Sequence, residues 1–382
     1  MLSDKITLGL RPNRSLGSTS LGRENMSRHI SGRKIALVAA VSASMVLSVG
    51  LTSASNAAAK KVTVSLITKD STNPFFVAMQ AGAKKNAKAL GVNIVIGSGA
   101  KEGDVAGQVR LIENAIANKE QGILITPTAE GVNAAILKAR KAGLFVIALD
   151  TPPVAKNIVD ITYATDNFLA GVNIGKWTAA KLGGKKAVIA MLDIYTDQIA
   201  SVDLGRDQGF LKGMGIAGAD PAVNGKEPAT GKYTGGKGGD YQICGHVASH
   251  GNSQDGQTGM EQLLAKCPDI NVVYSINEPS GLGAYAALTA AGKSAIISSV
   301  DGGSAGIKAV AAGKIGATSQ QYPLQMAVKG MQAIKDLITK GIKPKVTPGL
   351  SFFNTGTTLI TDDPQAGVPS KDTKYGLANA WG

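Results

Sequence analysis

Aromatic residues are scarce in this chain: Phe, Tyr and Trp together make up 4% of its 382 residues. Cysteine is scarcer, with 2 residues, so the chain cannot be a small scaffold held together by several disulfides. Charged residues make up only 18% and hydrophobic residues 44%, a balance that excludes a disordered chain. A chain of this length can bury a large core, and it favours two domains over one.

Acidic residues are also in the minority, and the formal net charge of +13 raises the question of a nucleic-acid partner. Much of the excess lies in residues 1–59, which hold seven Lys and Arg but two acidic residues. The other 323 residues carry a net charge of +8, spread along predicted helices and a Lys- and Gly-rich insertion. Because these charges form no single basic stripe, we expect no nucleic-acid partner.

Residues 1–59 have the pattern of an export signal, a signal peptide that is removed. Basic residues precede an apolar run at 35–51, and three alanines at 57–59 offer a cleavage site. Translation could start at either Met1 or Met26. The run contains serines and is short for a membrane span, so a retained anchor is the weaker interpretation. With no cysteine near the cleavage site for a lipid, we expect a soluble protein in the periplasm or at the extracytoplasmic cell surface.

The two cysteines, Cys244 and Cys267, would lie in an oxidising compartment after export. A disulfide between them is therefore the expected state, and two buried free thiols are the alternative. Together with His246 and His250, they include the ligand types of a zinc site. Gly251 would break any helix that brought the two histidines together, so we predict a disulfide and no metal site.

Short apolar runs alternate with amphipathic segments of helical length from residue 60 onward. The expected strands are 62–67, 92–96, 122–125, 144–149, 187–192, 272–276, 295–300 and 350–354. The expected helices are 74–90, 104–118, 129–142, 166–182, 203–214 and 322–340. Near-continuous apolar strands separated by helices indicate an α/β fold with parallel sheets covered on both faces. We expect a surface insertion at 217–240 and an irregular tail after Pro364.

Three motifs resemble catalytic or phosphate-binding signatures, but each lacks a required part. The segment 302–306 (GGSAG) matches a nucleophile elbow, yet every histidine precedes Ser304 and such a triad needs one later in the chain. The segment 291–294 (AGKS) lies before a strand instead of a helix. The segment 97–99 (GSG) has no third glycine at position 102. We therefore expect a protein that is not an enzyme, with no catalytic residue and no cofactor.

Polar residues stand at the carboxyl ends of the predicted strands, where open parallel sheets bind their ligands. These positions are held by Lys69, Asp150, Asn277, Asp301 and Gln321. Phe75 and Phe76 begin a helix at the same edge; Phe76 fits the apolar stripe of that helix, whereas Phe75 could stack on a ring. Polar groups that can bind neutral hydroxyls beside an aromatic face suit a sugar. For each Asp or Asn taken alone, a helix cap is an equally good interpretation.

Several ordered motifs together resemble the ribose-binding-protein family, the periplasmic-type substrate-binding proteins of ABC sugar importers. The motifs are NPFF at 73–76, ILITPT at 123–128, VIALD at 146–150, ATDN at 164–167, RDQGF at 206–210, INE at 276–278 and VDG at 300–302. The resemblance runs from about residue 61 to 353. It implies a type I periplasmic-binding-protein fold of two lobes, each a mostly parallel sheet flanked by helices.

The resemblance also implies where the chain crosses between the lobes, near Thr165, Gln321 and Leu350. We expect residues 60–165, completed by 322–350, to form the N-terminal lobe. Residues 166–321, completed by 351–382, would form the C-terminal lobe.

The family's sugar contacts carry over to positions that match its motifs. With Lys69 added, the expected substrate-binding residues are Lys69, Asn73, Phe75, Phe76, Asp150, Arg206, Asn277, Asp301 and Gln321. Two positions depart from the ribose binder: Lys69 replaces a small hydroxyl residue, and Thr151 replaces an arginine. The segments 67–69, 149–152 and 319–323 look like the fructose-binding branch, so we expect fructose or a similar pentose or hexose.

The resemblance implies an ABC permease as the partner of a monomeric binding protein that closes on its sugar. A sugar receptor in chemotaxis is one alternative. The sugar-responsive effector domain of a lactose-repressor-type regulator is another, but the apolar run at 35–51 is unlike a DNA-binding helix-turn-helix.

Overall fold

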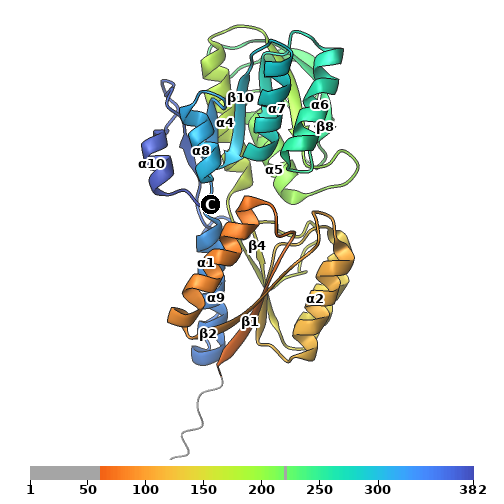
Figure 1. The fold of residues 1–382 in the computed structure, drawn as a ribbon, viewed down its shortest axis with the longest axis vertical. Coiled ribbons are helices and arrows are strands. Elements are labelled where there is room, and N and C mark those ends of the chain that lie inside the picture. Colours follow the sequence, from red (N-terminus) through yellow and green to blue (C-terminus); the bar gives the residue numbers. More distant parts are fainter. Residues whose placement is uncertain (1–60, 219–221) are drawn as a thin grey trace, which may run out of the picture. The chain divides into compact units, whose positions relative to one another are not determined.

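The computed structural model describes residues 61–218 and 222–382, which belong to one compact unit of the chain. The predicted export signal at 1–59 lies outside the described residues. Within the described part of the chain, no helix has the length and apolar character needed to cross a membrane. Two sheets, each flanked by helices, make up the fold (Figure 1).

The first sheet has the strand order β12-β5-β4-β3-β1-β2, and all its neighbours are parallel. Its strands are β1 (Val62–Thr68), β2 (Val92–Ser98), β3 (Gly122–Ile125), β4 (Phe145–Leu149), β5 (Ile161–Ala164) and β12 (Phe353–Asn354). The central strands are buried on both faces, which explains their continuous apolar runs.

Helices cover both faces of this sheet. They are α1 (Pro74–Leu90), α2 (Val105–Ala117), the short 3₁₀ helix η1 (Glu130–Val132), α3 (Asn133–Lys141) and α9 (Pro323–Lys340). Helices α1 and α9 pack together on the face that Leu124 enters, while α2 and α3 cover the face of Ile123 and Ile125. Figure 1 shows α1 and α9 on one side of this sheet and α2 on the other. Asn73 caps α1, and Pro74 occupies its first turn, as the sequence predicts.

The second sheet has the order β13-β11-β10-β9-β6-β8-β7. Its strands are β6 (Ala187–Asp193), β7 (Thr230–Tyr233), β8 (Gly239–Ala248), β9 (Val272–Ser275), β10 (Ile296–Asp301), β11 (Ala317–Gln320) and β13 (Thr358–Ile360). The pairs are parallel except for β7 with β8 and β11 with β13, which are antiparallel.

The helices around the second sheet are α4 (Asn167–Leu182), α5 (Ser201–Met214), α6 (Ser253–Lys266), α7 (Glu278–Ala290), α8 (Ser304–Ala311) and α10 (Thr373–Ala378). Helices α4 and α5 pack so closely that a Cβ at Gly171 would lie 2.1 Å from the carbonyl oxygen of Arg206. Glycine is therefore required there, and this contact fixes the position of α5 and of the residues it carries.

The chain passes from one sheet to the other between β5 and α4, between β11 and α9, and between β12 and β13. Thr165 lies in the first passage and Gln321 in the second. The third passage follows Asn354, because β12 pairs with β5 in the first sheet.

Two segments outside the predicted helices and strands contain regular elements. The segment 217–240, expected to be a surface insertion, contains the largely exposed strand β7, which forms an antiparallel pair with β8 at the sheet edge. The tail after Pro364, expected to be irregular, contains α10, and Trp381 near its end is buried. Both elements are short, and their stability comes from packing instead of local sequence pattern.

Candidate functional site

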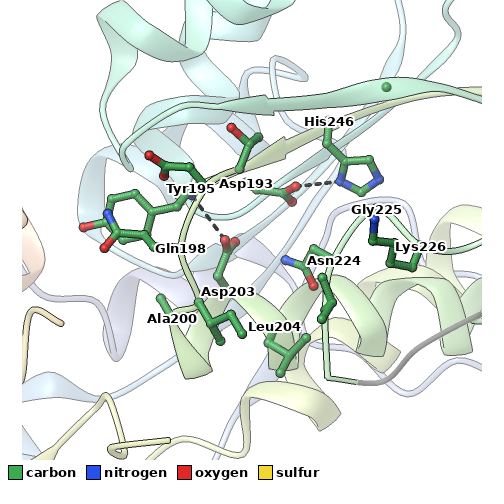
Figure 2. A pocket seen from close by; sticks show the side chains of 15 residues that line it. Asp193, Tyr195, Gln198, Ala200, Asp203, Leu204, Asn224, Gly225, Lys226 and His246 are labelled. Atoms are coloured by element: carbon green, nitrogen blue, oxygen red, sulfur yellow. Dashed lines mark hydrogen bonds and ion pairs between the residues drawn. The ribbon is translucent and has the colours of Figure 1, made fainter. Parts of the chain in front are cut away.

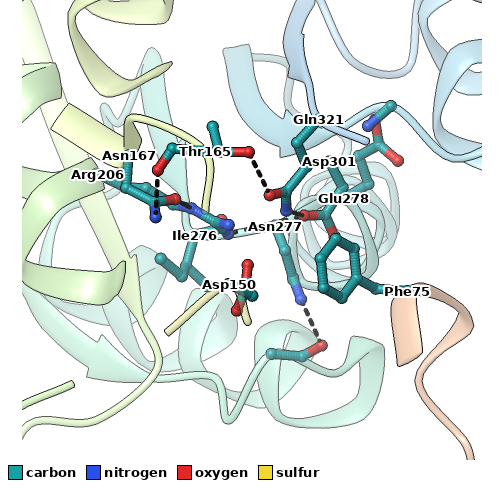
Figure 3. Close-up of polar contacts among 12 residues, drawn as sticks. Phe75, Asp150, Thr165, Asn167, Arg206, Ile276, Asn277, Glu278, Asp301 and Gln321 are labelled. Atoms are coloured by element: carbon teal, nitrogen blue, oxygen red, sulfur yellow. Dashed lines mark hydrogen bonds and ion pairs between the residues drawn. The ribbon is translucent and has the colours of Figure 1, made fainter. Parts of the chain in front are cut away.

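A small cavity of about 40 Å³ lies where the carboxyl ends of strands from both sheets meet. All nine predicted substrate-binding residues line it: Lys69, Asn73, Phe75, Phe76, Asp150, Arg206, Asn277, Asp301 and Gln321. We call this space the inner cavity; Figure 3 shows part of its wall. Five further residues line it that the prediction did not include: Glu102, Ile194, Val202, His250 and Gly251.

Asp150 follows β4 and is 4% exposed. Its Oδ2 accepts a hydrogen bond of 2.8 Å from the Thr151 hydroxyl, whereas Oδ1 has no hydrogen-bond partner among the described residues. Its backbone φ of +64° is unfavourable for a residue other than glycine. Such strain is maintained where the surrounding structure holds a functional side chain in place. A buried carboxylate oxygen therefore faces the cavity with its bonding capacity unused.

Asp301 ends β10 and also has a positive φ, +141°. Its Oδ1 accepts a hydrogen bond of 2.7 Å from Gln321 Nε2 and lies 3.7 Å from Arg206 Nη1. Burial raises the pKa of the Asp301 carboxyl to about 6, although Arg206 and Gln321 act in the opposite direction. Asp301 is therefore ionised at neutral pH and beside a fixed positive charge.

Arg206 extends from α5 and is held by one hydrogen bond to a backbone carbonyl and one to a side-chain amide (Figure 3). Its Nη1 donates to the Ile276 carbonyl at 2.9 Å, and its Nε donates to Asn167 Oδ1 at 2.8 Å. The side chain is 5% exposed, so the guanidinium is a buried and oriented group of hydrogen-bond donors.

Lys69 forms an ion pair with Glu102, with 2.9 Å between Nζ and Oε1. The same Glu102 oxygen accepts a hydrogen bond of 3.1 Å from the hydroxyl of Tyr195, which follows β6. Burial, together with the charge of Glu102, raises the pKa of Tyr195, so its hydroxyl stays protonated. This chain of three residues links the two sheets beside the inner cavity.

Asn73 and Asn277 both have the capping role that the sequence left as an alternative. Asn73 Oδ1 accepts from the Phe75 amide at 3.0 Å, and Asn277 Oδ1 accepts from the Ser280 amide at 3.1 Å. Asn277 Nδ2 also donates to the Gly251 carbonyl at 2.9 Å. Each asparagine therefore caps a helix and lines the cavity, and the two interpretations are compatible.

Three aromatic rings stand at one side of the cavity. Phe75 makes edge-on contacts with Phe76 and with Trp381, each with 5.4 Å between ring centroids. The Trp381 indole donates to the Gln321 carbonyl at 3.0 Å. Sequence reasoning missed Trp381 because it lies in the tail that was expected to be irregular; the only signal was that it is one of two tryptophans.

A wider groove of about 660 Å³ adjoins the inner cavity and shares Asn73, Glu102, His250 and Gly251 with it. Tyr195 lies in the wall of this groove. The shared residues place the groove directly beside the inner cavity.

The nucleophile-elbow motif at 302–306 has a structural role. The amides of Gly302 and Gly303 donate to the buried carboxylate of Glu278 at 2.7 and 3.1 Å. Ser304 donates through its hydroxyl to the Trp381 carbonyl at 3.3 Å. The turn thus joins α7, α8 and the C-terminal segment.

The structure joins Cys244 of β8 to Cys267 at the end of α6 in a disulfide, with 6.1 Å between the Cα atoms. This separation lies within the usual range for a disulfide. The two cysteines are therefore not arranged with His246 and His250 as zinc ligands.

The chain is similar to known proteins over most of its length. The family profile described as a periplasmic binding protein domain matches residues 64–342. The ribose import binding protein RbsB of Escherichia coli (strain K12) is 31% identical over 309 residues, which cover 80% of this chain and 92% of that protein. The D-allose-binding periplasmic protein of the same organism is 27% identical over 296 residues, covering 74% of this chain and 86% of that protein.

Solved structures share the fold. A solute binding protein of an ABC transporter from Agrobacterium vitis, with bound D-fucose, is 25% identical with a TM-score of 0.65. The similarity covers 81% of this chain and 100% of that one. A galactofuranose binding protein, at 22% identity, has a TM-score of 0.67 and covers 83% of this chain and 97% of its own.

Proposed function

The chain belongs to the periplasmic binding protein domain family and has its type I fold, and on this premise we propose that it captures a monosaccharide in the inner cavity for an ABC-type importer. Its relatives are named for binding and import, so the family supports a binding protein instead of an enzyme. The nine residues that line the inner cavity and were predicted from sequence are proposed as the sugar contacts.

The observation that carries this proposal is the pair of buried carboxylates, Asp150 and Asp301, that face one cavity together with Arg206. A sugar hydroxyl both donates and accepts, so it can bond a carboxylate and a guanidinium at the same time. Hydrogen bonds to ionised groups are shorter and stronger than neutral ones. An analogue that lacks one hydroxyl would leave a buried charged group without a partner, which gives selectivity.

Binding requires a conformational change. The inner cavity of about 40 Å³ has room for a few water molecules, whereas small-molecule pockets are typically about 300–1,000 Å³. The two sheets are connected by three chain passages, and hinges of this kind allow lobes to separate and close. We propose that sugar enters through the adjoining groove and that the closed, loaded form is what the permease recognises.

We propose fructose, or a similar pentose or hexose, as the ligand. Two positions differ from the pattern of a ribose binder: Lys69, which lines the cavity and forms an ion pair with Glu102, and Thr151, whose hydroxyl donates to Asp150. Three further points stay predictions: export to the periplasm or the extracytoplasmic cell surface, a monomeric state, and the lack of a nucleic-acid partner.

Titration calorimetry with fructose, ribose, allose, xylose, galactose, glucose and inositol tests the proposal. We expect one of these sugars to bind with one-to-one stoichiometry and Asp150→Asn to weaken it at least about tenfold, since the variant loses a charged acceptor. Asp240→Asn is the matched control, because Asp240 pairs with Lys232 on the surface of the second sheet. Binding of none of these sugars, or equal affinity in Asp150→Asn, would contradict the proposal.

A further inference from the structure

A second buried polar cluster lies in the second sheet, outside the inner cavity. It consists of Asp193 at the end of β6, Asp207 on α5, His246 on β8, and Glu227 in the segment before β7. His246 Nδ1 lies 2.6 Å from Asp193 Oδ2 and 3.7 Å from Asp207 Oδ2. His246 Nε2 lies 2.6 Å from Glu227 Oε1. Figure 2 shows the Asp193 and His246 side chains facing each other.

The acidic side chains of this cluster are almost fully buried, with exposures of 1% for Asp193, 0% for Asp207 and 2% for Glu227. Each nevertheless has one carboxylate oxygen without a hydrogen-bond partner among the described residues: Asp193 Oδ1, Asp207 Oδ2 and Glu227 Oε2. A buried carboxylate oxygen without a partner costs free energy unless a cation or a donor compensates it. The cluster thus has unused acceptors that point to a missing positive group.

His246 supplies at most one positive charge to three carboxylates, and Asp203 on α5 adds a fourth acid nearby. The three carboxylates that face this imidazole therefore outnumber the single group that can carry a positive charge among them.

We propose that Asp193, Asp207 and His246 form a binding site for a divalent transition-metal ion, of which Zn²⁺ is the first candidate. One imidazole nitrogen and two carboxylate oxygens are a ligand set that Zn²⁺ accepts, whereas Ca²⁺ and Mg²⁺ prefer oxygen ligands alone. The sequence alone predicts no metal site, because His246 stands near Cys244, Cys267 and His250 in it, whereas Asp193 and Asp207 are distant along the chain.

The distances suit such an ion. One ligand atom from each of the three residues lies within 4.8 Å of the other two. Metal bonds of about 2.0–2.2 Å at tetrahedral angles place ligand atoms about 3.3 Å apart. The separations of 2.6 and 3.7 Å from His246 Nδ1 lie on either side of this value, so small side-chain movements would admit the ion.

Glu227 has the position of an orienting group behind a metal-bound histidine. If the ion binds at Nδ1 of His246, the other ring nitrogen, Nε2, can donate its proton to Glu227 Oε1 at 2.6 Å. Metal-bound histidines usually donate in this way to a carboxylate, which fixes the ring and strengthens it as a ligand. Gly225, with a φ of +73°, lies beside this ring, and a Cβ at this position would stand 3.5 Å from the imidazole Cδ2.

The site is also accessible. Asp193 and His246 line a cavity of about 540 Å³ that is bounded by residues 195–200 and 223–226 (Figure 2). The cavity provides an entry path for the ion and space for a water molecule as a further ligand.

Calorimetric titration of the untagged, metal-stripped protein with Zn²⁺ tests the site, and Co²⁺ and Ca²⁺ are titrated in parallel. We expect one equivalent of Zn²⁺ or Co²⁺ to bind and to raise the melting temperature, with Ca²⁺ much weaker. Asp207→Asn should weaken Zn²⁺ at least about tenfold, whereas Asp240→Asn, the same chemical change on an exposed residue of β8, should not.

A second readout does not depend on variants that fold less well. The imidazole ¹⁵N signals of the wild-type protein should show Zn²⁺ at Nδ1 of His246, with His250 unchanged. Two results would overturn the proposal: no binding of Zn²⁺ or Co²⁺, which leaves His246 as an imidazolium paired with acids, or binding that leaves the His246 signals unchanged and persists in Asp207→Asn.

Discussion

Arg206 and Asp207 are neighbours on α5, yet they belong to two different polar clusters. Arg206 faces the inner cavity with Asp150 and Asp301, and Asp207 lies against His246 and Asp193 in the second sheet. In an α-helix, consecutive side chains point about 100° apart, so one helix can supply both clusters. The close packing of α4 on α5 at Gly171 fixes both side chains at once.

The two clusters differ in the balance of charge. Around the inner cavity, the permanent cation Arg206 stands near Asp301, and Lys69 pairs with Glu102. In the second cluster, the only positive group within the described contacts of Asp193 and Glu227 is the imidazole of His246. A cluster in which two of the acids stand beside cations and acceptors are left over suits a neutral polyol, and a cluster with excess acid suits a cation. Chemically similar carboxylates can thus serve different ligands a short distance apart.

The largest expected effect is the loss of sugar binding in Arg206→Met. The variant removes the oriented guanidinium and leaves Asp301 without its cation, so we expect sugar affinity to fall at least about hundredfold. Zn²⁺ affinity should change little, because Arg206 is not a ligand of the second cluster. Calorimetry with both ligands checks this, and circular dichroism confirms folding; a sugar affinity within about threefold of wild type would contradict the assignment of Arg206.

The reciprocal variant, Asp207→Asn, should affect only the second cluster. Its sugar affinity should stay within about twofold of wild type while Zn²⁺ binding weakens at least about tenfold, because Asp207 does not line the inner cavity. Parallel titrations of the two ligands give the answer. Equal losses for sugar and Zn²⁺ would show that the clusters act as one site.

The next largest effect is expected in the pH dependence of sugar binding, which depends on Asp301 at the inner cavity. Because burial raises the pKa of Asp301 to about 6, its carboxylate is protonated as the pH falls below this value. The ionised carboxylate is the stronger acceptor, so sugar affinity should fall by up to about tenfold between pH 7 and pH 5. Asp301→Asn should bind more weakly but without this pH dependence. A flat profile for the wild-type protein would contradict the role of the Asp301 charge.

The smallest effect is expected for Tyr195→Phe, at the residue that lies between the two regions. Its hydroxyl bonds to Glu102 beside the inner cavity, and its backbone amide bonds to Asp203 near the second cluster. Loss of one hydrogen bond of about 1 kcal/mol should weaken sugar binding about two- to tenfold and leave Zn²⁺ binding unchanged. An increase in sugar affinity would instead show that this bond holds the cavity too tightly closed.

Much of the fold could be predicted because its central strands are buried on both faces and read as continuous apolar runs. Strand β3, for example, was predicted with the bounds that the structure has. Strand β5 was missed, although it is buried, because the polar segment before it gave no strand signal. Strand β7 and helix α10 are short and depend on contacts with distant parts of the chain.

The inner cavity could be predicted because the carboxyl ends of parallel strands meet at the same edge of a sheet. The topology alone therefore places a polar residue that follows a strand, such as Asp150, at this edge. The partners that these residues contact could not be predicted. Glu102 comes from a loop, and Trp381 comes from the last residues of the chain. The second cluster joins Asp193, Asp207 and His246 from three separate elements, with no spacing pattern that sequence could show.

The most direct test of the account is a crystal structure of the protein with the monosaccharide that binds most tightly in calorimetry. We predict that the sugar lies in the inner cavity, widened from its present volume, with hydroxyls bonded to Asp150, Arg206 and Asp301. A sugar bound elsewhere, or one in that cavity that contacts neither carboxylate, would contradict the account.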